Sequence, residues 1–251
     1  MGHKAKSRFR NELAAELLSA ADILERERIC PDVGPLKAAA NQCKSSGGDH
    51  WGYDVSNLIL RLVPGTQTLP SGLTSLDCRL NVSIGGLCSQ ANLQEDPMTK
   101  AAIDLVLEGT LQTTGKKYLQ SWHFDRHCSN ACAVEPKAAH PRYHFHFGGK
   151  QMEAFALENG LECFDPVLLL EGPRIAHAPL DGVLIIDFLL SNFIGEKWRT
   201  LRNDRRYRQI VDASQQRNWK PFVTALMSHW PSQVIKSSWS PVDVWPHFCQ
   251  V

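Results

Sequence analysis

The sequence lacks an excess of charge of either sign. Its 27 Lys and Arg residues stand against 26 Asp and Glu, which leaves a formal net charge of +1. A chain without a strong overall field is not drawn as a whole onto nucleic acid or an anionic membrane surface. Any contact with phosphate groups would therefore depend on a local basic patch.

Long hydrophobic runs are also missing. The N-terminal residues 1–8 are basic, but no apolar segment follows them, so they do not form a secretory signal. The most apolar stretch, 179–194, is too short to span a bilayer and contains Asp181 and Asp187. We therefore expect a cytoplasmic protein with no membrane partner.

Several standard motifs are absent. The eight cysteines include no Cys-x-x-Cys pair, which favours reduced thiols over a disulfide framework. His127 with Cys128 and Cys132 would supply at most half of a zinc site, and a loop with incidental cysteines explains them equally. The chain has no Walker-type phosphate loop, Gly-x-Gly-x-x-Gly, Gly-x-Ser-x-Gly or His-Glu-x-x-His. ATP hydrolysis, dinucleotide chemistry and serine esterase activity are therefore disfavoured.

The hydrophobic periodicity predicts an α+β fold in which helices cover one face of an antiparallel β-sheet. Helices are expected at 8–28, 180–193, 204–215 and 220–229, and residues 41–50 are expected to form a loop. Strands are expected at 58–63, 78–84, 103–108, 117–125, 142–147 and 167–170. We expect one domain, 1–251, with an N-terminal helical region (1–50), the sheet (51–170) and a helical C-terminal region (171–251).

Two predicted strands, 117–125 and 142–147, carry the main candidate site. If they pair, period-two alternation places four polar side chains on one face whatever the register. These are His123, Asp125, His144 and His146. The aromatic residues expected to face the core are Trp122, Phe124, Tyr143, Phe145 and Phe147.

Three imidazoles and a carboxylate suit a divalent metal such as Zn²⁺, Mn²⁺ or Fe²⁺, and they also suit general acid–base catalysis. His127 and His140 flank the next loop and could join the group. Cross-strand His–Asp hydrogen bonds can equally be structural.

Arg174 lies in a Pro-bounded loop just before the buried helix. Loops on rigid scaffolds often carry function, so Arg174 is a candidate to hold a phosphate or to pair with Asp125. Asp187 lies inside the apolar helix and needs a partner if it is buried. We expect that partner to be Arg174 or one of the sheet histidines.

The His-x-His spacing of His144 and His146 also occurs in rolling-circle nickases, for which Tyr207 would be the formal nucleophile. Tyr207 fits a helix core equally well. Histidine-triad hydrolases need a third histidine at the next alternate position, which here is Gly148.

A basic stretch at 199–208 could contact nucleic-acid phosphates. Its arginines are Arg199, Arg202, Arg205, Arg206 and Arg208. Asp204 and Asp212 dilute the positive charge, and a solvated helix face explains the same pattern.

Four segments together carry a resemblance: Ser-Trp-His-Phe-Asp-Arg at 121–126, His-Pro-Arg-Tyr-His at 140–144, Pro-Arg-Ile at 173–175 and 187–193. They are similar to uncharacterised prokaryotic domain-of-unknown-function families from mobile-element and phage-defence loci. The resemblance covers about residues 117–230 and implies no established activity. The Cys128–Cys132 loop is not part of that pattern.

Three hypotheses follow. The leading one is an accessory component of a prokaryotic defence or mobile-element system, bound to another protein of the same locus or to nucleic acid. Tryptophans towards the C-terminus would then offer a partner surface, namely Trp219, Trp230, Trp239 and Trp245. The second is a metal-dependent hydrolase, including a nuclease, in which Asp125 is a ligand or base and Arg174 holds a phosphate. The third is a non-catalytic scaffold.

Overall fold

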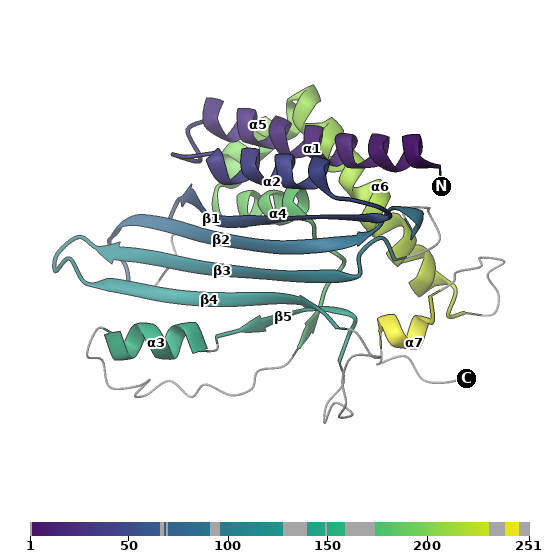
Figure 1. Cartoon of the computed structure of the whole chain (residues 1–251). Helices are drawn as coiled ribbons and strands as arrows, with labels where there is room; N and C mark the ends of the chain where they lie inside the picture. The colour runs from purple at the N-terminus through teal and green to yellow at the C-terminus, as the bar shows by residue number, and fades with distance from the viewer. Residues whose placement is uncertain are drawn as a thin grey trace.

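The computed structural model contains one antiparallel sheet whose six strands follow chain order, β1-β2-β3-β4-β5-β6 (Figure 1). The strands are β1 (His50–Leu62), β2 (Leu73–Leu87), β3 (Lys100–Leu111), β4 (Lys117–Arg126), β5 (Tyr143–Phe147) and β6 (Ile175–Ala176). The structure describes residues 2–65, 68, 70–90, 96–127, 140–148, 150–158, 174–230 and 239–245. The predicted α+β class is confirmed.

The helices are α1 (His3–Arg26), α2 (Gly34–Ser45), α3 (Lys150–Glu158), α4 (Gly182–Phe193), α5 (Gly195–Asn203), α6 (Arg205–Met227) and α7 (Pro241–Val244), with a 3₁₀ turn at Cys88–Gln90. In Figure 1, α1, α2, α4 and α6 gather on one side of the sheet, next to β1 and β2. Among the described residues, no helix combines the length and the apolar character needed to cross a membrane.

Helix α2 corrects the loop expected at 41–50. It begins with Gly34 and Pro35, and a proline in the first turn costs no hydrogen bond. Its buried face consists mainly of small residues such as Ala39, Ala40 and Cys43, whose helical spacing gives a weak hydrophobic signal.

Strand β1 begins well before the predicted segment 58–63. The sequence pattern missed its first half because a bulge interrupts the alternation of buried and exposed side chains. Tyr53 and Val55 are buried before the bulge, and Leu58 is buried after it. The register shifts between Val55 and Leu58, where Asn57 has φ +54°. One extra residue restores the same face to the core, but it breaks the period-two pattern in the sequence.

Strand β2 continues through Gly85 and Gly86, beyond the predicted end at residue 84. A Cβ at Gly86 would clash with the carbonyl oxygen of Pro97 and the indole of Trp51. Glycine therefore permits a close approach of the backbone here and does not end the strand.

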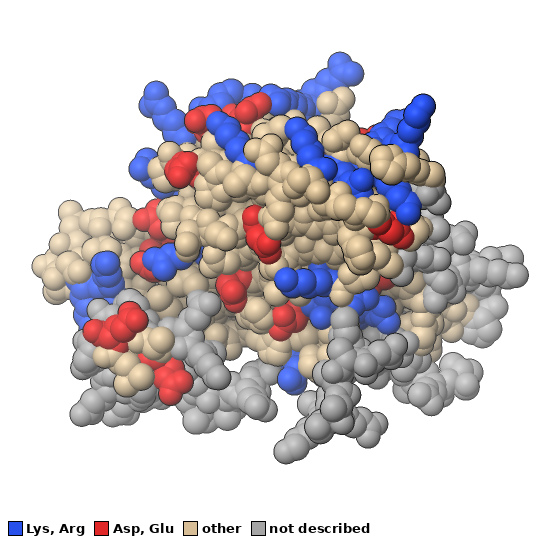
Figure 2. Space-filling view, viewed as in Figure 1, with Lys and Arg blue, Asp and Glu red and all other residues tan. Residues whose placement is uncertain are grey.

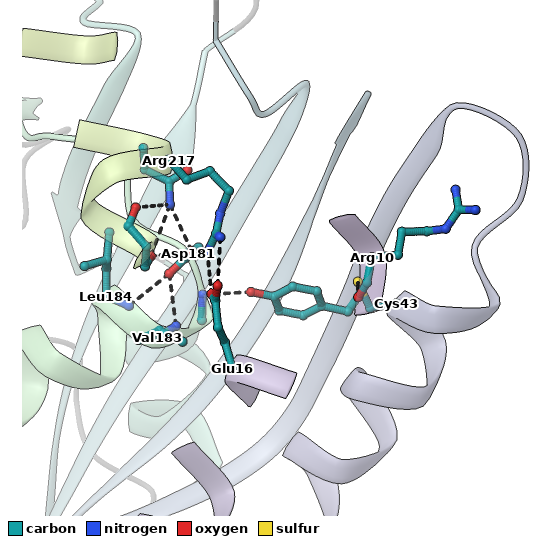
Figure 3. Close-up of polar contacts among 11 residues, drawn as sticks. Arg10, Glu16, Cys43, Asp181, Val183, Leu184 and Arg217 are labelled. Carbon is teal, nitrogen blue, oxygen red and sulfur yellow. Dashed lines mark hydrogen bonds and ion pairs between the residues drawn. The ribbon is translucent and has the colours of Figure 1, made fainter. Parts of the chain in front are cut away.

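Helix α6 is continuous where two helices, 204–215 and 220–229, were expected, and it contains Pro221. At the expected break, Arg217 and Asn218 donate hydrogen bonds to the buried Asp181 at 3.0 and 2.9 Å. Arg217 also pairs with Glu16 of α1 at 2.6 Å (Figure 3). This buried ionic network of Glu16, Asp181 and Arg217 joins α1, α4 and α6.

Asp181 is also the N-cap of α4. Its carboxylate accepts hydrogen bonds from the backbone N–H groups of Val183 and Leu184, at 3.1 and 3.0 Å (Figure 3). The cap satisfies donors that the first helical turn leaves without partners.

Helix α3 lies within the segment expected to hold the sheet, 51–170, and β6 lies within the segment expected to be helical, 171–251. The single domain with three regions stays a prediction. Helix α5 was not predicted. The strand expected at 167–170 lies outside the described residues.

Candidate metal site on strands β4 and β5

Strands β4 and β5 pair antiparallel, with His123 opposite His146 and Asp125 opposite His144. Phe124 lies opposite Phe145 on the alternate face. The register therefore places the four predicted polar side chains on one face of the sheet. Most of the aromatic residues point into the core as expected, but Phe147, at the end of β5, is 39% exposed.

The rings of His144 and His146 face one another and are joined by a hydrogen bond between their Nε2 atoms. Their Nε2 atoms are 2.7 Å apart. His144 Nδ1 lies 2.9 Å from the carbonyl oxygen of Pro141, which can only accept, so Nδ1 carries the proton. The neutral His144 ring therefore carries its lone pair on Nε2, where it accepts a hydrogen bond from the Nε2–H group of His146. A metal would bind the same lone pair and replace this hydrogen bond.

His140 completes a group of three histidines. One nitrogen from each of His140, His144 and His146 lies within 4.8 Å of the others. The Nδ1 atom of His140 is buried and has no hydrogen-bond partner among the described residues. His127 stacks on the His140 ring with centroids 3.9 Å apart. The sequence signal for this residue is the His-Pro-x-x-His segment, in which His140 precedes β5 by a short turn.

The three histidines are held in the neutral form. Burial, together with the neighbouring histidines, lowers the pKa of both His140 and His144 to about 4. Burial and the positive charge of Arg174 lower the pKa of His146. Metal ligands must be deprotonated, so the environment favours the binding form at neutral pH.

His123 has a different role. Its Nδ1 lies 2.6 Å from Asp104 Oδ1, and its Nε2 lies 2.7 Å from Asp125 Oδ1. Hydrogen bonds to Asp104 and then Asp125 raise the pKa of His123 to about 10. A protonated imidazole has no lone pair for a metal, so His123 is a cation between two carboxylates in this arrangement. Asp104 comes from β3, and the sequence interpretation did not include it in the site.

Asp125 connects the two groups. Its Oδ2 atom lies 3.8 Å from His146 Nε2, while Oδ1 binds His123. Burial opposes ionisation of Asp125, but the hydrogen bond and the charge of His123 hold its pKa below the ordinary value. Asp125 is therefore a carboxylate beside the histidine group.

Arg174 lies directly before β6, which pairs with β5 through Ala176 opposite His144. Its charge lowers the pKa of His127, His140 and His146, after the larger effect of burial. Its Nε atom is buried without a hydrogen-bond partner in the described part of the chain. Arg174 is therefore close enough to the histidines for its charge to act on them.

Asp187 has other partners than those expected. Trp198 Nε1 and the Tyr207 hydroxyl donate to its carboxylate at 2.8 Å each, and Arg202 pairs with it at 2.5 Å. Helix α5 folds back along α4 and brings Arg202 to Asp187, which excludes the expected pairing with Arg174 or a histidine. Tyr207 is buried and its hydroxyl is bonded, so the structure favours the helix-core reading over a nickase nucleophile.

The basic stretch 199–208 is divided between α5 and α6 by Asp204. Two of its arginines have partners, Arg202 with Asp187 and Arg206 with Asp22. Arg199, Arg205 and Arg208 are exposed. Figure 2 shows Lys and Arg side chains over the helical side of the molecule, with acidic side chains among them.

Two further expectations have different outcomes. Cys128 and Cys132 lie outside the described residues, so the cysteine zinc site stays a prediction. Of the tryptophans proposed as a partner surface, Trp219, Trp239 and Trp245 pack against the core, and Trp230 is 51% exposed.

No family model, curated protein or solved structure matches this chain. The similarity to families of defence and mobile-element loci therefore stays a prediction from the sequence.

Proposed function

We propose that the protein is a metal-dependent hydrolase that binds one Zn²⁺ ion through His140, His144 and His146. The observation that carries this proposal is the convergence of three imidazole nitrogens within 4.8 Å. Three protein ligands leave a fourth tetrahedral position for water or substrate, which is the pattern of catalytic zinc sites. Zn²⁺ in such a position lowers the pKa of its bound water to about 7 and so supplies hydroxide at neutral pH.

The surroundings of the ligands support the same function. The Pro141 carbonyl fixes the tautomer of His144, as outer-shell partners of metal-binding histidines usually do. Asp125 stands 3.8 Å from His146 and is placed to orient a water molecule or accept its proton.

The charges indicate an anionic substrate. Three neutral imidazoles leave the charge of a divalent ion uncompensated, and Arg174 adds a further positive charge beside them. A planar guanidinium with several N–H donors matches the geometry of phosphate oxygens. We therefore assign a phosphate ester as the substrate class.

Metal binding is tested first by Zn²⁺ titration against a chromogenic chelator. We expect one equivalent for the wild type and an affinity lower by about 100-fold or more for His144→Ala and His146→Ala, because each removes a direct ligand. His50→Ala is the matched control, since it removes an exposed histidine on β1 and should leave the affinity unchanged. Substoichiometric binding by the folded wild type would reject the site and favour a structural histidine network.

Hydrolysis is tested with bis(4-nitrophenyl) phosphate and the zinc-loaded protein. Arg174→Met should lower kcat/KM by about 10-fold or more while Zn²⁺ affinity is retained, because the lost interaction is with the substrate. Full zinc occupancy without turnover of any phosphate ester would support the metal site but reject the proposed hydrolase activity.

The accessory role in a prokaryotic defence or mobile-element complex rests on the resemblance, on the basic stretch 199–208 and on the tryptophans towards the C-terminus. No contact among the described residues favours it over the metal site, and co-purification with a neighbouring gene product is its direct test.

A further inference from the structure

A cavity lies between the sheet and α4, on the face of β4 and β5 opposite to the histidines. Its volume is about 350 Å³, and its lining includes Trp122, Phe145 and Phe188. Phe145 stands between His144 and His146 in the sequence of β5, so its side chain points away from the histidines. A molecule in this cavity is separated from the candidate metal site by the backbone of the sheet.

Aromatic rings form the walls of the cavity. Phe145 and Phe188 are stacked, with centroids 5.3 Å apart and an interplanar angle of 25°. Trp122 meets Phe145 edge-on at 6.3 Å. Such walls offer flat faces and ring edges, the arrangements that aromatic partners prefer.

Three polar side chains line the cavity, namely Gln120, His177 and Asn192, and of these the His177 ring packs edge-on against the aromatic walls at Phe145 and Phe188. His177 has its Nδ1 atom 2.7 Å from the carbonyl oxygen of Ala178, so Nδ1 is the donor. Burial lowers the pKa of His177, which keeps the ring neutral. Its Nε2 atom therefore carries a lone pair and has no hydrogen-bond partner among the residues that the structure describes.

We propose that this cavity binds a small, flat aromatic molecule with one hydrogen-bond donor, which it gives to His177 Nε2. Cavities for small molecules begin near 300 Å³ and combine apolar walls with a few polar groups, as this one does. A helix from a protein partner is about 10 Å across and too bulky for this volume. The proposal is independent of the metal site.

The test uses indole and 1-methylindole, which have nearly the same shape but differ in the N–H donor. Isothermal titration calorimetry should give saturable one-site binding of indole and about 10-fold weaker binding of 1-methylindole, the ratio expected for one hydrogen bond. His177→Phe should remove this preference while circular dichroism shows an unchanged fold. Equal affinities for the two probes in the wild type would overturn the role of His177.

A pair of tryptophan substitutions locates the binding. Ile175 lines the cavity and is 49% exposed, whereas Val223 lies on α6 outside the lining and is 47% exposed. Ile175→Trp should abolish indole binding by filling the space, and Val223→Trp should leave it unchanged. Absence of saturable indole binding by the folded wild type, or an equal loss in both variants, would overturn the proposed cavity site.

Discussion

His123 and His144 lie on neighbouring strands and share one face of the sheet, yet their neighbours give them different charges. His123 stands between Asp104 and Asp125 and is a cation. His144 contacts a backbone carbonyl and another imidazole and stays neutral. One residue type therefore serves as a charged cross-strand link in one place and as a candidate metal ligand in the other.

This difference predicts a pH dependence for the metal-free protein. The pKa of His123 is raised to about 10 in the folded state, against about 6.5 in the unfolded chain. Its contribution to stability is therefore complete below pH ~6.5 and is lost as pH rises towards 10. The side chains of His123, Asp104 and Asp125 are about one third exposed, so we expect only about 1 kcal/mol.

Urea denaturation of the protein in a chelating buffer measures this loss. The difference in unfolding free energy between the wild type and His123→Gln should shrink between pH 6.5 and 10. A difference that stays constant across that window would mean that His123 is not charged in the folded state.

The sequence was sufficient to predict that His123, Asp125, His144 and His146 share one face of the sheet, because the period-two alternation of strands alone determines this. Asp104 was missed as a partner because its position opposite His123 depends on the register between β3 and β4, which no local pattern specifies. The convergence of His140 on the site depends on how the chain returns into β5, which is also a tertiary property.

At the scale of elements, α5 and α6 meet at Asp204, whose extended backbone ends one helix and caps the next. Its carboxylate accepts hydrogen bonds from the N–H groups of Arg206 and Tyr207 at 2.7 and 3.1 Å. It also pairs with Arg26 of α1 at 2.9 Å. Asp204 therefore combines a cap with an exposed ion pair.

Two substitutions separate these contributions. Asp204→Ala should lower the free energy of unfolding by about 1 kcal/mol, because both the cap and the ion pair are lost. Asp204→Asn keeps a capping oxygen and should cost less than about 0.5 kcal/mol, since exposed ion pairs contribute little. Chemical denaturation of both variants measures the difference, and equal losses would show that the ion pair dominates.

Element types were predicted more successfully than their limits. The apolar spacing at 180–193 corresponds to α4, Gly182–Phe193, because that helix is buried nearly all round. The limits of β1 and β2 were missed for the reasons found at Asn57 and Gly86, where a bulge and a close backbone approach override the local pattern. The buried face of α2 consists mainly of small residues, so its helical periodicity gives only a weak hydrophobic signal in the sequence.

At the scale of the whole molecule, the buried ionic network of Glu16, Asp181 and Arg217 holds the N-terminal and C-terminal helices together. The three side chains are between 4% and 12% exposed. Burial acts to raise the pKa of Asp181, but Arg217 and several hydrogen bonds hold it below the ordinary value. Glu16, in contrast, has a pKa raised by burial despite the same arginine.

Arg217→Met should therefore be severely destabilising. It keeps most of the apolar stem of the side chain but leaves two buried carboxylates without their cation, which costs about 3–5 kcal/mol. Arg206→Met on the same helix is the matched control, because its pair with Asp22 is about half exposed and should contribute less than about 1 kcal/mol. Urea denaturation compares the two, and similar losses would contradict a structural role for the network.

The pair between Glu16 and Arg217 spans 201 positions of the chain. At 5–20 residues per second, a ribosome needs about 10–40 s to make the intervening residues. During that time α1 has been synthesised, but the cation for its inward-pointing glutamate has not. The sheet can pair strand by strand as it emerges, whereas the packing of α1 against α6 must await the synthesis of α6.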